Sequence, residues 1–242
     1  MFLSVIDELP STQDYLSTQA NIRILPEWTI CRTLHQNKGK GMGANSWESE
    51  KNKNLLFSLF LRPVFLAPFE AFSLSKLIAL GIRDTLQEFV QQPVYIKWPN
   101  DIFIKNKKVC GMLVENTFTD TSIQSCLIGI GININQGSFP ASLPNASSLI
   151  TYTHKPLPLE AILREALQRI KQYYQQVRLS GVETLNDNYL GHLYQRNQWH
   201  EYETDSGRFE GRITGVAPYG FLQIEDRQEK VHTFDVKQVR YL

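Results

Sequence analysis

Apolar residues recur at the three-and-four spacing of helices in several segments of the chain. Residues 68–89 begin at a proline and predict a long helix with one buried face. The residues on that face are Leu74, Ile78, Ile82, Leu86 and Phe89. Segments 158–177 and 182–193 repeat the spacing, and Ser11 or Thr12 can cap a further helix that runs to about residue 20.

Shorter apolar runs bounded by glycine, proline and asparagine predict strands. They lie near residues 28–35, 54–61, 94–98, 101–104, 109–115 and 125–135. The last run is apolar on both faces at its start, so we expect it to lie in the centre of a sheet. Residues 136–157 are rich in serine, proline and asparagine and predict a loop.

The pattern changes after about residue 195. Four strand-like pieces follow at 199–204, 208–216, 220–225 and 230–235, separated by turns that contain glycine, proline or aspartate. They predict a small all-β module that closes as a barrel. The expected division of the chain is therefore a large domain over residues 1–195 and a small β domain over residues 196–242.

Composition and charge narrow the class of protein. The chain has 242 residues, of which 42% are hydrophobic and 20% charged, and its net charge is +1. This balance provides no concentrated basic face, so no nucleic-acid partner is expected. The N-terminus lacks the basic region of a signal peptide, and arginine and proline interrupt the most apolar stretch, residues 54–72. The three cysteines lack metal-ligand spacing and are expected to be reduced, so we predict a cytoplasmic protein that does not enter a membrane.

A glycine-rich segment, residues 35–47, lies between two predicted core strands and reads His-Gln-Asn-Lys-Gly-Lys-Gly-Met-Gly-Ala-Asn-Ser-Trp. Its spacing is not that of a P-loop or a dinucleotide-binding turn, and no helix follows it. One interpretation is a flexible hairpin. The other is a lid over an anionic ligand, to which Lys38 and Lys40 supply charge and Trp47 a ring face for stacking.

Two further segments carry candidate chemistry. A strand that ends in Lys-Trp-Pro-Asn-Asp (residues 97–101) must turn at its proline, which exposes Asn100 and Asp101 at the end of the sheet. Lys108 begins a later strand, and Gly111 inside that strand indicates close approach of a ligand or another backbone. Aspartate can hold Mg²⁺ or a ribose and lysine can neutralise phosphate, although Asn and Asp after a proline are also ordinary turn formers.

The last predicted strand of the large domain ends in polar residues. Its sequence over residues 129–135 is Gly-Ile-Gly-Ile-Asn-Ile-Asn, so Asn133 and Asn135 would share one face and read a polar ligand edge. By contrast, Lys105 and Lys107 predict a solvated hairpin tip. The residue types together indicate a site for a nucleotide and an acid, with neither a P-loop nor a Ser/His/Asp nucleophile set.

In their order and spacing, these motifs resemble those of the biotin protein ligases. The resemblance rests on Ser11-Thr12-Gln13, Gln36 with the glycine-rich segment to Trp47, the run at 97–101, Lys108 to Glu115, and Gly129 to Asn133. It covers about residues 5–135 strongly and continues more weakly to the C-terminal module. It implies an α+β catalytic domain, with a mixed central β-sheet and helices packed on one side, followed by a small SH3-like β-barrel.

The resemblance also implies a two-step reaction that uses ATP and Mg²⁺. The carboxylate of biotin attacks the α-phosphate to give biotinyl-5′-AMP, and a lysine of a biotin carboxyl carrier protein then displaces AMP. Many members carry an N-terminal helix-turn-helix that has no counterpart in this sequence, so we expect a monofunctional ligase. A homodimer is one assembly open to such a chain.

Site residues follow from the resemblance position by position. The implied biotin contacts are Ser11, Thr12, Gln13, Gln36, Lys40, Gly41, Met42, Lys108 and Gly111. The implied ATP contacts are Trp47, Lys97, Asn100, Asp101, Lys108 and Asn133. Of these, Lys108, Lys40 and Asp101 are the expected catalytic residues, and Asp101 is also the expected magnesium ligand.

The chain departs from the family pattern at two places. Gln13 stands where asparagine is usual, and Lys40 and Met42 stand where the loop usually carries arginines. Lysine is a point charge that cannot bind two oxygens as a fork. Two alternative functions therefore remain, a lipoate-type protein ligase, whose substrate needs a long apolar slot, and a non-catalytic sensor of biotinyl-adenylate.

Overall fold

A seven-stranded sheet forms the centre of the computed structural model, which describes residues 2–43 and 45–242. Its strands, in spatial order, are β1 (Phe2–Leu9), β2 (Thr29–Gln36), β5 (Leu55–Leu61), β9 (Ile123–Ile132), β8 (Lys107–Phe118), β7 (Asp101–Ile104) and β6 (Val94–Lys97). Strands β1 and β2 run parallel, and every other neighbouring pair is antiparallel. The predictions of a mixed sheet and of a central last strand are therefore confirmed.

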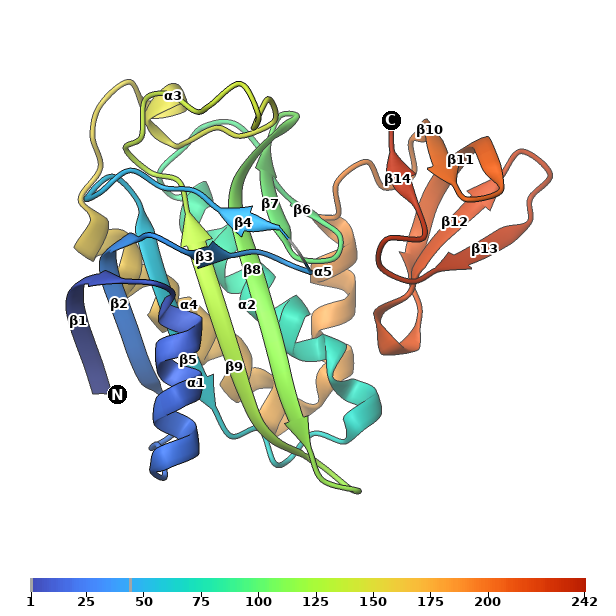
Figure 1. The fold of residues 1–242 in the computed structure, drawn as a ribbon. Helices are drawn as coiled ribbons and strands as arrows, with labels where there is room; N and C mark the ends of the chain where they lie inside the picture. The colour runs from blue at the N-terminus through green and yellow to red at the C-terminus, as the bar shows by residue number, and fades with distance from the viewer. Residues whose placement is uncertain (1, 44) are drawn as a thin grey trace.

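Helices cover both faces of this sheet (Figure 1). The long helices α2 (Phe72–Gln87) and α4 (Leu159–Ser180) pack on one face, whereas α1 (Thr12–Ile22) packs on the other. The prediction of helices on one side is therefore wrong for α1. The physical reason lies in β5, which is buried at every position and needs an apolar cover on each face.

Several predicted helices and loops have shifted boundaries. The helix expected from residue 68 begins as a 3₁₀ turn, η1 (Pro68–Glu70), before α2 starts. The segment 182–193 is divided into η2 (Val182–Leu185) and α5 (Asn186–Gly191), and a short helix, α3 (Ile150–Thr153), lies in the predicted loop. Ser11 caps α1 as predicted, because its side chain accepts a hydrogen bond from the backbone N–H of Asp14.

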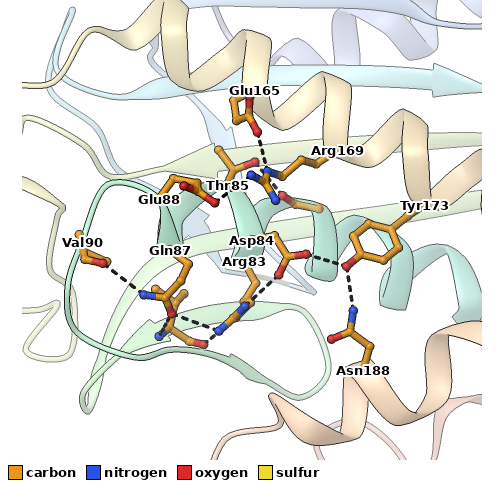
Figure 2. A network of polar contacts seen from close by, with 12 residues as sticks. Arg83, Asp84, Thr85, Gln87, Glu88, Val90, Glu165, Arg169, Tyr173 and Asn188 are labelled. Carbon is orange, nitrogen blue, oxygen red and sulfur yellow. Dashed lines mark hydrogen bonds and ion pairs between the residues drawn. The ribbon is translucent and has the colours of Figure 1, made fainter.

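A polar network joins α2 to α4 on the face opposite α1 (Figure 2). The hydroxyl of Tyr173 donates to Asp84 Oδ2 at 2.6 Å and accepts from Asn188, while Arg169 pairs with Glu88 and Glu165. Burial, followed by the hydrogen bond to Asp84, raises the pKa of Tyr173 to about 12. These groups fix the packing of the helices.

The C-terminal residues form a second, five-stranded sheet. Its order is β13 (Val231–Phe234), β12 (Leu222–Asp226), β11 (Gly207–Val216), β10 (Trp199–Thr204) and β14 (Arg240–Tyr241), with a 3₁₀ turn, η3 (Pro218–Gly220), between β11 and β12. Strands β13 and β14 are free edges of this sheet. The predicted strands are confirmed, but closure into a barrel is not, because no ladder joins the two edges among the described strands.

This C-terminal sheet packs against the large domain (Figure 1). Ile213, Leu222 and Ile224 are buried in the same core as the residues of α2 and α4. The indole N–H of Trp98 donates to the carbonyl of Gly220 at 2.7 Å. The two parts therefore share one hydrophobic core.

The state of the cysteines and the length of the apolar helices bear on two further predictions. Cys31, Cys110 and Cys126 are buried free thiols, as predicted, and burial raises the pKa of Cys31 to about 12. Within residues 2–43 and 45–242, no helix is long and apolar enough to cross a bilayer.

Candidate active site

A cavity that opens to solvent lies on the α1 face of the sheet. Glycines 111, 129 and 131 of β8 and β9 form its floor, with Gly111 directly opposite Gly131 in the ladder. Side chains on this floor would collide with the walls. A Cβ on Gly131 would lie 2.4 Å from the Trp47 ring, and one on Gly129 would lie 2.9 Å from Gln13 Oε1. The glycines therefore allow flat groups to lie directly on the backbone.

The first turn of α1 forms a polar wall of this cavity. The hydroxyl groups of Thr12 and Ser58 lie 2.8 Å apart. Gln36 Oε1 accepts hydrogen bonds from the Thr12 backbone N–H at 2.8 Å and from its hydroxyl at 3.0 Å. Ser11, Thr12 and Gln13 are all buried here, so this wall is a fixed set of neutral donors and acceptors.

Gln13 has one unsatisfied acceptor in this wall. Its amide nitrogen donates to Glu115 Oε2 at 2.9 Å and to the carbonyl of Leu127 at 3.3 Å. Its Oε1 atom is buried, lies over Gly129 and has no hydrogen-bond partner among the described residues. Because an unpaired buried acceptor is costly, this oxygen is available to accept a hydrogen bond from a ligand N–H group.

The glycine-rich segment forms a short hairpin that crosses the sheet above the floor (Figure 1). Strand β3 (Gly39–Lys40) pairs with β4 (Ser46–Trp47), and the N–H of Gly41 donates to the carbonyl of Asn45 at 2.8 Å. Lys40 donates to Asp14 at 2.6 Å, and this hydrogen bond raises the pKa of Lys40. The charge of Lys40 is therefore paired with α1, and Met42 adds none.

The Trp47 ring closes this hairpin onto the floor. It lies against both Gly111 and Gly131. The close approach predicted at Gly111 is therefore made by the Trp47 ring. The ring nitrogen is buried and has no partner among the described residues. At the hairpin tip, a Cβ on Gly43 would lie 2.6 Å from Nζ of Lys237, so the tip lies beside the segment that joins β13 to β14.

The cationic end of the cavity is built around Lys108. Its Nζ lies 2.6 Å from Asp101 Oδ1 and 5.7 Å from the centre of the Trp47 ring. Two backbone hydrogen bonds fix Lys108, whose N–H donates to Asn145 at 2.7 Å and whose carbonyl accepts from Ser147 at 2.9 Å. The ammonium therefore starts from a rigid backbone position.

Asn100 lines the cavity and also holds its own turn. Its side chain donates to the carbonyl of Met112, and its carbonyl accepts from the Met112 N–H at 2.9 Å. This exchange fixes the end of β7 against β8, so Asp101 projects toward Lys108.

The structure brings most of the predicted site residues to this one cavity. Those that line it are Ser11, Thr12, Gln13, Gln36, Lys40, Gly41, Met42, Trp47, Asn100, Asp101, Lys108 and Gly111. Lys97 and Asn133 do not line it. Asn133 lies beyond the end of β9, buried, with an unpartnered Oδ1 among the described residues.

One interpretation of the asparagines is wrong. Strand β9 ends at Ile132, so Asn133 and Asn135 do not continue its alternation. Asn135 exchanges two hydrogen bonds with the backbone of Leu157, at 2.9 and 2.8 Å. Its side-chain amide therefore fastens a loop.

Other residues of the cavity lie inside the motifs named above but were not predicted as site residues. They are Asn45, Ser46, Met112, Leu113, Gly129, Ile130 and Gly131 in the lining and Glu115 behind it, whereas Ser58, also behind it, lies outside those motifs. Ser58 had a usable signal, because it is the single polar residue in the fully buried strand β5. By contrast, no sequence pattern indicated the backbone clasp of Lys108, meaning its two backbone hydrogen bonds to residues 145 and 147.

The donor set does not form a metal centre by itself. Among the described residues, no three His, Cys, Asp or Glu side chains lie close enough together to hold an ion. Asp101 is the one carboxylate that the described residues contribute to the lining, and it is paired with Lys108. A magnesium ion here would need most of its ligands from a bound phosphate chain and water.

The cavity therefore offers neutral donors and acceptors at one end and a lysine that can stabilise phosphate charge at the other, over a glycine floor. The chain belongs to the biotin/lipoate A/B protein ligase family, whose model matches residues 5–133.

Named relatives are similar over most or part of the chain. The bifunctional ligase/repressor BirA of Bacillus subtilis is 28% identical over 237 residues, which cover 96% of this chain and 72% of that protein. The biotin–[acetyl-CoA-carboxylase] ligase of Mycobacterium tuberculosis is 25% identical over 152 residues, 61% of this chain and 54% of that protein.

A solved structure shares the whole fold. The biotin protein ligase from Aquifex aeolicus in complex with biotin and ATP has a TM-score of 0.82 and 23% identity, and the match covers 100% of this chain and 99% of that one.

Proposed function

We propose that this protein is a biotin protein ligase. It activates biotin with ATP as biotinyl-5′-AMP and transfers the biotinyl group to a lysine of a biotin carboxyl carrier domain. The observation that carries the proposal is the unpartnered Gln13 Oε1 in a neutral polar wall, with Lys108 in the same cavity. The named relatives and the matching structure, with its biotin and ATP, support the same assignment.

In the first step, a carboxylate oxygen of biotin forms a bond to the α-phosphorus of ATP. The bond from that phosphorus to the bridging oxygen breaks, and pyrophosphate leaves. Negative charge develops on the α-phosphate oxygens, and the Lys108 ammonium, fixed by its backbone clasp, stabilises that charge. In the second step, the neutral amine of the carrier lysine attacks the acyl carbon, AMP leaves and the amine loses a proton.

The polar wall orients biotin. An N–H of its ureido ring would satisfy Gln13 Oε1, and the ureido oxygen would accept from the Ser11 hydroxyl, because the Thr12 hydroxyl donates to Gln36. The flat glycine floor leaves room for the fused rings. A lipoyl tail would leave Gln13 Oε1 unpaired, which disfavours the lipoate alternative.

Asp101 is the residue that would hold a magnesium ion brought with ATP, and the ion would supply charge neutralisation at the phosphates. The Lys108 ammonium lies beside this carboxylate at the same end of the cavity.

Residues 1–195 form the proposed catalytic domain and residues 196–242 an SH3-like accessory domain. The change from long helices to short antiparallel strands near residue 199 supports this division. The homodimer, the lack of a nucleic-acid partner and the cytoplasmic location remain predictions from the sequence.

Pyrophosphate–ATP exchange is the experiment that tests the function. We expect label from pyrophosphate to enter ATP when biotin is present and not without it. Lipoate at the same concentration should support little exchange. Equal exchange with lipoate would sink the substrate assignment, and ATP binding without any exchange would favour the sensor.

Replacing Gln13 by leucine is expected to raise the KM for biotin by about 10- to 100-fold, with a smaller change in kcat. The variant removes the acceptor for the ligand N–H and also the amide that bonds Glu115. Initial exchange rates at varied biotin measure the effect. The control is Gln19→Leu on the same helix, outside the cavity, and a similar rise in KM there would contradict the role of Gln13.

A further inference from the structure

Lys97 forms no ion pair with an acidic side chain in the part of the chain that the structure describes. It lies opposite Asp101 in the β6–β7 ladder, beside the Asp101–Lys108 pair. Among the described residues, its ammonium has neither a hydrogen bond nor an ion-pair partner within 4.0 Å. Instead, Nζ lies 4.4 Å from the centre of the Tyr241 ring and 4.9 Å from that of Phe103.

Tyr241 belongs to the C-terminal sheet, and its position there is fixed. It lies in β14, where its ring packs against Tyr202 at 5.5 Å and Tyr194 at 6.5 Å. Its hydroxyl is buried without a partner among the described residues, so the ring and not the hydroxyl makes the contact with Lys97. The Trp98–Gly220 hydrogen bond holds the sheet in place one residue from Lys97.

An aromatic partner differs from a carboxylate in what it leaves available. A carboxylate cancels the charge of the lysine it binds, as Asp14 does for Lys40. A ring face attracts an ammonium through its quadrupole and has no net charge, so the full positive charge remains for an incoming anion. The pKa of Lys97 is lowered, mainly by burial. The nearby charge of Asp101 opposes this shift, whereas that of Lys108 adds to it.

We propose that Tyr241 is a positioning residue that holds the Lys97 ammonium ready for the phosphate chain of ATP. The inference rests on the proposed function, because it takes ATP as the anion. It adds a role for the C-terminal sheet, which supplies one of the two rings around a cation of the large domain. Lys97 in β6 and Lys108 in β8 would then approach the phosphates from the two strands that flank β7.

The test is a double-mutant cycle between Tyr241 and Lys97 in the full-length chain. Tyr241→Leu is expected to raise the Kd for ATP and the KM for ATP by about tenfold, with the KM for biotin within about twofold of wild type. Tyr241→Phe keeps the ring and should restore wild-type values. In the Lys97→Met background, Tyr241→Leu should cause no further loss, because the cation it positions is gone.

The control separates positioning from docking of the C-terminal sheet. A Cβ on Gly220 would lie 2.4 Å from the Phe72 ring, so Gly220→Ala disturbs docking without touching Lys97. If Tyr241→Leu matches Gly220→Ala in raising both KM values and lowering the melting temperature, Tyr241 serves docking alone and the inference is overturned. Additive losses in the cycle would overturn it as well.

Failure of the proposed function would look different. Wild-type protein that binds no ATP, or that exchanges pyrophosphate without biotin, would remove the premise. If the wild-type protein binds ATP and Tyr241→Leu has the same Kd and KM for ATP, only the inference about Tyr241 is refuted.

Discussion

Lys108→Ala is expected to slow biotin-dependent pyrophosphate–ATP exchange by about 10²–10³-fold at saturating substrates. Its ammonium is paired with Asp101 at 2.6 Å, and its backbone is held by Asn145 and Ser147. A donor fixed in this way needs little reorganisation when charge develops on the α-phosphate. The substitution also leaves Asp101 as an unpaired negative charge beside the phosphates, which adds to the loss.

Lys105 provides the matched control. It lies three residues away, is exposed and adopts a φ of 53°, a conformation that asparagine tolerates. Lys105→Asn removes one positive charge from the same end of the sheet, and its exchange rate should stay within about twofold of wild type. If both variants lose a similar fraction of the exchange rate, the lysines act only as a general basic patch and Lys108 has no specific role. Lys107 is less suitable, because it donates to the Pro144 carbonyl at 2.7 Å and is not simply solvated as predicted.

Short-range motifs were the part of the site that the sequence could predict. The run at 97–101 forms the end of β6, a turn and the start of β7, because its proline cannot continue the ladder. The N-cap at Ser11 and the buried face of α4 were predicted for similarly local reasons. Each depends on chemistry within one turn or one strand.

Contacts between distant segments could not be predicted. Strand β1 was missed because it is an edge strand with several exposed residues, and its pairing is parallel to β2 across an intervening helix. The clasp on Lys108 and the ring of Tyr241 over Lys97 come from segments that only the tertiary fold brings near. The open edges of the C-terminal sheet likewise depend on its strand order, which four short runs do not define.

Gly131→Ala is expected to lower the exchange rate by about 10²-fold, because small misplacements in an active site have effects of this size. The added methyl would lie 2.4 Å from the Trp47 ring, so the ring must leave the floor and the β3–β4 hairpin must rise with it. An open hairpin admits water to the acyl-adenylate and withdraws its backbone N–H groups from the ligand.

Limited trypsin digestion reports this displacement independently of activity, since Lys38 and Lys40 lie in the hairpin. Biotin and ATP together should slow cleavage there in the wild type, because the ligands add contacts that hold the hairpin closed. They should protect Gly131→Ala much less. Gly137→Ala is the control, because a Cβ at Gly137 meets nothing within 4 Å, and both rate and protection should remain wild-type.

The two interpretations of the glycine-rich segment differ in this experiment. A lid that works by resting Trp47 on Gly111 and Gly131 must lose activity and ligand-dependent protection together in Gly131→Ala. A rigid hairpin would be protected equally with and without ligands. Unchanged exchange in Gly131→Ala would show that the working enzyme does not use the Trp47–glycine contact, and the lid would have to be abandoned. Joint loss would mean that the floor glycines set the closed position of the hairpin.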